Sequence, residues 1–218
     1  MSSVKPPEDS EIQAGKAGQK ASGPGPWRRL WHVAGGSAFP VLAFFVSRNI
    51  LLIVLGAAII VVIGWEIVRL ASPGVNQWIA ARLRLLLKKK ERFQLTGTTY
   101  LLLASLATFF FFEKYVAITS LLFLSLGDFM AAAIGVRFGK HKLLAKSLEG
   151  SLACLASCLI IGTIMTVTGT GISLPVAFSG AFTATIVELL PIPPDDNLTI
   201  PLFSALVMTL TAMALGWF

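Results

Sequence analysis

Charged residues are scarce in this chain of 218 residues: Asp, Glu, Lys and Arg together make up 13% of it, whereas 55% of the residues are hydrophobic. No ordinary soluble domain needs so much apolar surface, so the composition excludes one. Cysteine is scarce too, with only Cys154 and Cys158. Two thiols one helical turn apart, with no His or further Cys nearby, make a poor metal site and no disulfide framework. We expect them to pack in an apolar interior.

Long apolar runs dominate the rest of the chain, and a bilayer needs about 20 apolar residues for each helical span. Strand alternation and internal repeats are both lacking. The sequence therefore predicts an all-α integral membrane protein with about seven transmembrane helices. The seven segments cover roughly 30–47, 49–70, 97–112, 115–135, 150–169, 172–190 and 198–217.

The first 26 residues differ from the rest, being rich in Gly, Pro, Ser, Lys and Glu and lacking an apolar stretch. This composition predicts a disordered tail, and without an apolar h-region we do not expect a cleavable signal peptide. Residues 27–218 are then a single polytopic membrane domain.

The basic residues fall on one side of the predicted topology. The tail up to Arg29 holds five Lys and Arg residues, the 71–96 connection six and the 136–149 connection four, whereas the opposite connections hold only Arg48 and Lys114. By the positive-inside rule this side is cytoplasmic, so the N-terminus lies inside, in the plasma membrane if the source is prokaryotic. The net charge of +7 sits between spans, which favours lipid head groups or nucleotide phosphates over nucleic acid.

Five acidic residues also fall at the cytoplasmic ends of predicted spans. A carboxylate near hydrocarbon is costly unless it is paired, wet or ligating something. We therefore expect a functional site at the cytoplasmic membrane interface. The five are Asp128, Glu149, Glu188, Asp195 and Asp196.

The densest candidate stretch runs from Gly127 to Ser151. Small residues that allow close approach of a backbone or a ligand are followed by lysines and then by a helix start at Ser147. A helix N-terminus behind a loop with Gly and Lys suits a phosphate. The alternative is a basic loop in which Ser147 is an ordinary N-cap and Glu149 lies in the first turn.

Near the last span, the stretch ELLPIPPDDNLTIPL places hard oxygen ligands at Asp195, Asp196 and Asn197, which suit a magnesium ion that also binds phosphates. Helix capping after the prolines is the alternative. In the second span, Glu66 and Arg69 are spaced to pair on one helix face.

In order along the chain, these motifs resemble the CTP-dependent lipid-alcohol kinases. That family includes dolichol kinase, phytol and farnesol kinases and yeast-type diacylglycerol kinase, and it is related to phosphatidate cytidylyltransferases. The matching elements are Arg28, Arg29 and His32 at the first span, Glu66-x-x-Arg69, Glu91 before TGTTYLLLA, the run from Asp128 to Ser151, and Glu188 with DDNLTIPL. Arg29 stands where the family has Lys. The last two elements are the most specific.

The resemblance implies transfer of the γ-phosphoryl group of CTP to the hydroxyl of a membrane lipid alcohol, with Mg²⁺ as cofactor. The lipid, the nucleotide and the bilayer are then the partners, and the oligomeric state stays open. It implies catalytic roles for Asp128, Asp196 and His32 and metal binding by Asp128, Glu188, Asp195 and Asp196. Glu66, Arg69 and Glu91 would support the site. The implied nucleotide or phosphate contacts are Arg28, Arg29, Gly135, Gly139, Lys140, Lys146, Ser147, Glu149, Gly150 and Asn197.

Two other functions remain open. A phosphatidate cytidylyltransferase would also use CTP but would make a CDP-lipid and release pyrophosphate. A small membrane transporter would place charges in its spans, yet here the charges gather at one end of the spans.

Overall fold

A computed structural model describes residues 26–82, 91, 93–144 and 146–217. The predicted tail lies outside these residues, except that the first helix already begins at Pro26. Each of the seven apolar segments coincides with helical structure: α2 (Pro26–Phe45), α3 (Arg48–Ala71), α5 (Gly97–Phe111), the segment Lys114–Phe138, α8 (Leu148–Val167), α9 (Leu174–Leu189) and α10 (Asp196–Ala214).

Four of these helical segments are long and apolar enough to cross a membrane: Arg48–Ala71, Lys114–Phe138, Leu148–Val167 and Asp196–Ala214. The apolar parts of α2, α5 and α9 are shorter. At about 1.5 Å per residue, the 15 residues of α5 fall short of the roughly 30 Å of a hydrocarbon core. The helical class is confirmed, with four candidate membrane-spanning helices, and the count of seven crossings stays a prediction.

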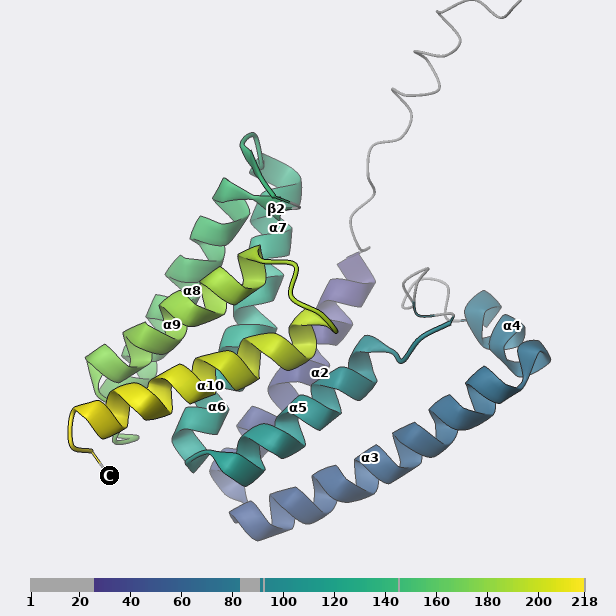
Figure 1. The fold of residues 1–218 in the computed structure, drawn as a ribbon, viewed down its shortest axis with the longest axis horizontal. Coiled ribbons are helices and arrows are strands. Elements are labelled where there is room, and N and C mark those ends of the chain that lie inside the picture. The colour runs from purple at the N-terminus through teal and green to yellow at the C-terminus, as the bar shows by residue number, and fades with distance from the viewer. Residues whose placement is uncertain (1–25, 83–90, 92, 145, 218) are drawn as a thin grey trace, which may run out of the picture.

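The connections alternate between the two ends of the bundle. Figure 1 shows the connection after α3, the α7–α8 hairpin and the α9–α10 connection at one end, with the α2–α3, α5–α6 and α8–α9 turns at the other. The described residues that border the three strongly basic regions, namely the start of α2, the first residues after α3 and the α7–α8 hairpin, therefore lie at one end of the bundle. The side of the membrane that this end faces stays a prediction.

Local capping explains several of the helix boundaries. Ser47 and Glu113 are N-caps of α3 and α6, and the Glu113 carboxylate accepts bonds from the backbone N–H groups of Tyr115 (2.6 Å) and Val116 (3.2 Å). Gly169 and Gly171 have positive φ angles in the turn after α8, where a side chain would be strained. These residues let the chain reverse tightly at the end opposite the basic connections.

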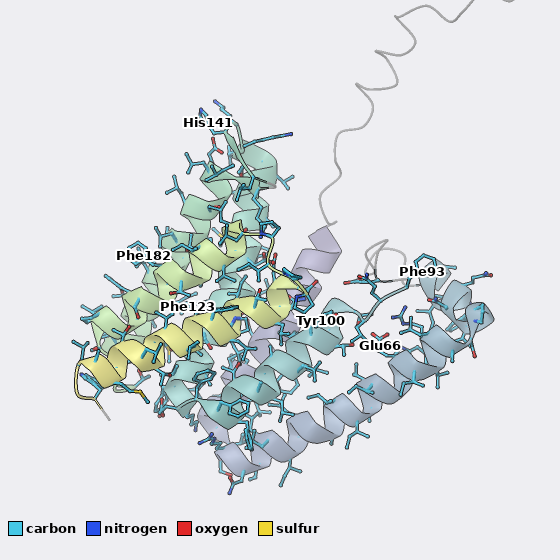
Figure 2. The ribbon with its side chains drawn as sticks, viewed as in Figure 1. Glu66, Phe93, Tyr100, Phe123, His141 and Phe182 are labelled. Carbon is cyan, nitrogen blue, oxygen red and sulfur yellow. The ribbon has the colours of Figure 1, made fainter. Side chains whose placement is uncertain are left out.

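The segment Lys114–Phe138 contains a feature that apolar periodicity does not reveal. It consists of α6 (Lys114–Leu122), a π-helical turn η2 (Phe123–Asp128) and α7 (Phe129–Phe138). Gly127 in this turn faces the two cysteines, because a Cβ there would lie 2.8 Å from the Cys158 Sγ. Both thiols are buried in the core, as expected. Phe123 lies at the centre of the bundle (Figure 2).

Two short elements were not predicted. Helix α4 (Pro73–Arg82) begins the long connection after α3. The strands β1 (Lys142–Leu143) and β2 (Lys146–Ser147) form an antiparallel hairpin between α7 and α8. Neither element has the length or the apolar pattern that makes a sequence signal strong.

Candidate active site

Lys146 joins two carboxylates from separate parts of the chain. Its Nζ lies 2.9 Å from Glu188 Oε1, near the end of α9, and 3.1 Å from Asp196 Oδ2, at the start of α10. Ser151 Oγ on α8 donates to the second oxygen of Glu188 at 3.3 Å. Glu188 is buried, while Lys146 and Asp196 are partly exposed. Three residues that the sequence assigned to one site therefore do converge at the basic end of the bundle.

Asp128 adds a third carboxylate to the surroundings of Lys146. It is partly buried at the end of the η2 turn. Burial disfavours the charged ammonium of Lys146, but the carboxylates of Asp196, Glu188 and Asp128 outweigh it and raise the pKa of Lys146. Lys146 is therefore a fixed positive charge surrounded by acids at neutral pH. We call Asp128, Lys146, Glu188 and Asp196 the acid–lysine cluster.

The hairpin that carries Lys146 is fixed by Glu149. Its carboxylate accepts from the backbone N–H of His141 (3.2 Å to Oε1) and lies 2.8 Å from the His141 Nδ1. Ser147 caps α8 by accepting from the Gly150 N–H at 3.2 Å. Both residues thus perform the structural roles given as alternatives above. Their contacts with phosphate stay predictions. Figure 2 shows His141 at the tip of the hairpin.

The three predicted glycines lie where α7 meets the start of α8. A Cβ on Gly150 would lie 2.7 Å from the Ala131 carbonyl oxygen, and one on Gly135 would lie 2.8 Å from Ser147 Oγ. A Cβ on Gly139 would lie 2.8 Å from the same hydroxyl. Close packing of chain segments is therefore what these glycines permit in this structure.

The start of α10 is built by Asp195 and Asn197. Asp195 Oδ1 accepts from the Asn197 backbone N–H at 3.2 Å, so Asp195 caps the helix. The Asn197 amide Nδ2 donates to the Gly97 carbonyl at 3.1 Å. Both side chains belong to buried residues. Asp196 lies between them in sequence and points its Oδ2 at Lys146 instead.

Glu66 and Arg69 form the predicted ion pair, and both are almost fully buried, at 2% and 1% exposed. Arg69 Nε donates to Glu66 Oε2 at 2.9 Å, and Nη2 donates to the same oxygen. The guanidinium also donates to the carbonyls of Glu91 and Gln94, each at 2.8 Å. The pair therefore organises the chain that leads into α5. Figure 2 shows Glu66 between the end of α3 and the start of α5.

Two carboxylates satisfy the free N–H groups at the start of α5. Glu66 Oε1 accepts from the Thr96 N–H and from Thr99 Oγ1, each at 3.0 Å. Glu91 Oε1 accepts from the Gly97 N–H at 3.1 Å. Negative charge at a helix N-terminus is favourable because of the helix dipole. Glu66, Arg69 and Glu91, which the sequence predicted to support the site, thus hold the start of α5 in place.

Sequence reasoning missed Thr96, Thr99, Gly97 and Ser151. The signals for them were present, since TGTT marks a helix start and Ser151 follows Glu149-Gly150. Among the other predicted site residues, Lys140 is exposed. The side chains of Arg28, Arg29 and His32 lie outside the described part of the structure, so their roles stay predictions.

Magnesium fits the donors of the cluster in one particular way. Glu188 and Asp196 already hold a cation between them, the ammonium of Lys146. Within the described ranges, no three His, Cys, Asp or Glu side chains converge to hold a metal. Magnesium is commonly bound through one or two carboxylates, water and substrate phosphates. The cluster suits an ion that arrives with a nucleotide better than one held by protein ligands alone.

Comparison with known proteins supports a distant relationship to a lipid kinase. The chain is 30% identical over 210 residues to "CTP-dependent diacylglycerol kinase 1" of Eremothecium gossypii, a match covering 83% of this chain and 65% of that protein. The chain thus spans just under two thirds of the length of that relative. It is also 25% identical over 189 residues to an uncharacterized protein of Rickettsia prowazekii, covering 84% of this chain and 92% of the relative. No protein-family model and no solved structure matches the chain.

Proposed function

We propose that this protein is a CTP-dependent kinase of the lipid-alcohol kinase family. It transfers the γ-phosphoryl group of CTP to the hydroxyl of a membrane lipid at the end of the bundle that carries the basic connections. The observation that carries the proposal is the acid–lysine cluster at that end of an apolar helix bundle. The similarity to a diacylglycerol kinase supports both the reaction and CTP as the donor.

The chemistry requires charge neutralisation and positioning more than covalent catalysis. The bond from the lipid oxygen to Pγ forms, the bond from Pγ to the bridging oxygen of CDP breaks, and CDP leaves. Lys146 turns from its carboxylates to the phosphates, and Asp128 accepts the proton of the lipid hydroxyl. Glu188 and Asp196 would hold magnesium, which would neutralise phosphate charge. Asp195 remains a predicted ligand, although one of its oxygens caps α10.

The site also suits two substrates that live in different solvents. A nucleotide approaches from water, whereas a lipid tail stays in the bilayer, so the reacting groups must meet near the membrane surface. The acid–lysine cluster lies where a hairpin and two helix ends meet. Because an apolar tail is recognised weakly, the lipid substrate remains open, with diacylglycerol as the first candidate.

The test is a transfer assay on purified protein with magnesium and γ-labelled CTP or ATP. The lipid panel holds diacylglycerol, phytol, farnesol, a polyprenol and dolichol. We expect label in one lipid phosphate, from CTP and not from ATP, and we expect Lys146→Met to lower turnover by about 100-fold or more. Gly56→Ala is the matched control, because a Cβ at Gly56 meets nothing within 4 Å.

Two outcomes would overturn the proposal. Pyrophosphate and a CDP-lipid formed from phosphatidate would establish a cytidylyltransferase. A nucleotide-independent, electrogenic flux in proteoliposomes, without lipid labelling, would establish a transporter.

A further inference from the structure

A series of hydrogen bonds links the end of α3 to Asn197, the residue next to Asp196 of the acid–lysine cluster. It begins at the buried Glu66–Arg69 pair, which holds the segment around Glu91. Glu91 then holds the N–H of Gly97, and the Gly97 carbonyl accepts from the Asn197 amide. Asn197 is the neighbour in sequence of Asp196. The bundle is thus connected from one edge to the other at its basic end.

The contact between Gly97 and Asn197 is the critical link, because it is the place where the starts of α5 and α10 touch through polar groups. The two residues are 100 positions apart in sequence. A Cβ on Gly97 would lie 2.7 Å from Asn197 Nδ2 and 3.3 Å from Glu91 Oε1. A side chain at position 97 would push the Asn197 amide away, so the hydrogen bond between the two residues depends on glycine here.

The geometry points to a positioning role for these hydrogen bonds: Glu91, Gly97 and Asn197 set the position of Asp196 relative to Lys146. The role rests on the proposed function in so far as Asp196 takes part in the reaction. Asp196 is the first residue of α10. The start of this helix is fixed by the Asp195 cap and by the Asn197 amide. Glu188 reaches Lys146 from α9 and does not use this link.

That difference gives an internal reference. Lys146 contacts one carboxylate that depends on the link, Asp196, and one that does not, Glu188. A loss of the link should weaken the first contact and spare the second. A general loss of stability would affect both.

The test is zero-length cross-linking of the full chain in micelles without nucleotide or metal. A water-soluble carbodiimide activates a carboxylate, and the amine of a lysine in contact displaces the activated oxygen, so that an amide forms and a urea leaves. Mass spectrometry then gives the ratio of the Lys146–Asp196 to the Lys146–Glu188 cross-link. We expect Asn197→Ala and Gly97→Ala to lower this ratio by about fivefold, as expected for the loss of one hydrogen bond.

Conservative and matched variants separate positioning from stability. Glu91→Gln keeps an acceptor for the Gly97 N–H and should preserve the ratio, whereas Glu91→Ala should lower it. Gly180→Ala is the packing control, because its Cβ would lie 2.5 Å from Met208 in the α9–α10 contact. It should lower the Tm and leave the ratio unchanged.

An unchanged ratio in Asn197→Ala and Gly97→Ala, or an equal fall in Gly180→Ala, would overturn the positioning role. The cross-link needs neither CTP nor turnover. A protein without kinase activity but with the expected ratios would therefore contradict the proposed function alone.

Discussion

Replacing Arg69 with methionine would leave Glu66 as a buried charge without its counter-ion. Removing one partner of a buried pair costs about 3–5 kcal/mol. Glu66 keeps the Thr96 N–H and the Thr99 hydroxyl as donors, which favours a cost near the lower end of this range. In the opposite direction, the carbonyls of Glu91 and Gln94 lose the hydrogen bonds that Arg69 donates. We therefore expect a loss of about 3 kcal/mol in the free energy of unfolding, which lowers the Tm of a chain of this size by about 6–12 °C.

Thermal unfolding in detergent micelles, followed by intrinsic fluorescence, measures this loss. The double variant Glu66→Gln, Arg69→Met removes the unpaired charge and keeps an acceptor for Thr96 and Thr99. It should recover about half of the lost stability. A loss below about 1 kcal/mol in the single variant would refute the reasoning, because a surface ion pair contributes no more than that. A double variant no more stable than the single one would refute it as well.

Three further predictions concern the basic end of the bundle. Asp128→Asn should lower turnover by about 100-fold or more in the lipid-labelling assay while the protein stays folded, and near-normal turnover would remove Asp128 from the reaction. Gly150→Ala should cost about 1–3 kcal/mol in thermal unfolding, because its Cβ would meet the Ala131 carbonyl at 2.7 Å, whereas Gly56→Ala in open space should be neutral or stabilising. Because folding raises the pKa of Lys146 above its ordinary 10.5, the Lys146 charge stabilises the fold fully below that pH, and this contribution disappears as pH rises through the folded pKa. In a chelator, the Tm difference between wild type and Lys146→Met should therefore be constant from about pH 7 to 9 and shrink above about 10.5, and a difference that grows at high pH would contradict this sign.

Much of the fold was predictable because a bilayer imposes a length on each apolar run. The alternation of the spans also predicted that Lys146 and the two acids Glu188 and Asp196 lie at one end of the bundle. The structure brings these three residues into contact. The pairing of Glu66 with Arg69 followed from their helical spacing. These features depend on the helical spacing of residues and on the alternation of spans across the membrane. Both can be read directly from the sequence.

The rest depends on how helices meet. The bond from Asn197 to Gly97 spans 100 positions, and no local pattern announces it. The glycines around Ser147 suggested close approach, but whether to a ligand or to a backbone depends on where α7 crosses α8. Glu113 lies at the opposite end from the other span-edge acids, and its capping of α6 shows that a span-edge acid need not belong to a site.

The π-helical turn at Phe123–Asp128 fits one more residue into a single turn than a regular helix would. If the same residues wound as an ordinary α-helix instead, everything after them would rotate by about 100° about the helix axis. Asp128 would then turn away from Lys146, even though every residue of the acid–lysine cluster would still be encoded. The wide turn between the buried centre of the bundle and Asp128 is therefore as much a part of the site as the carboxylate itself.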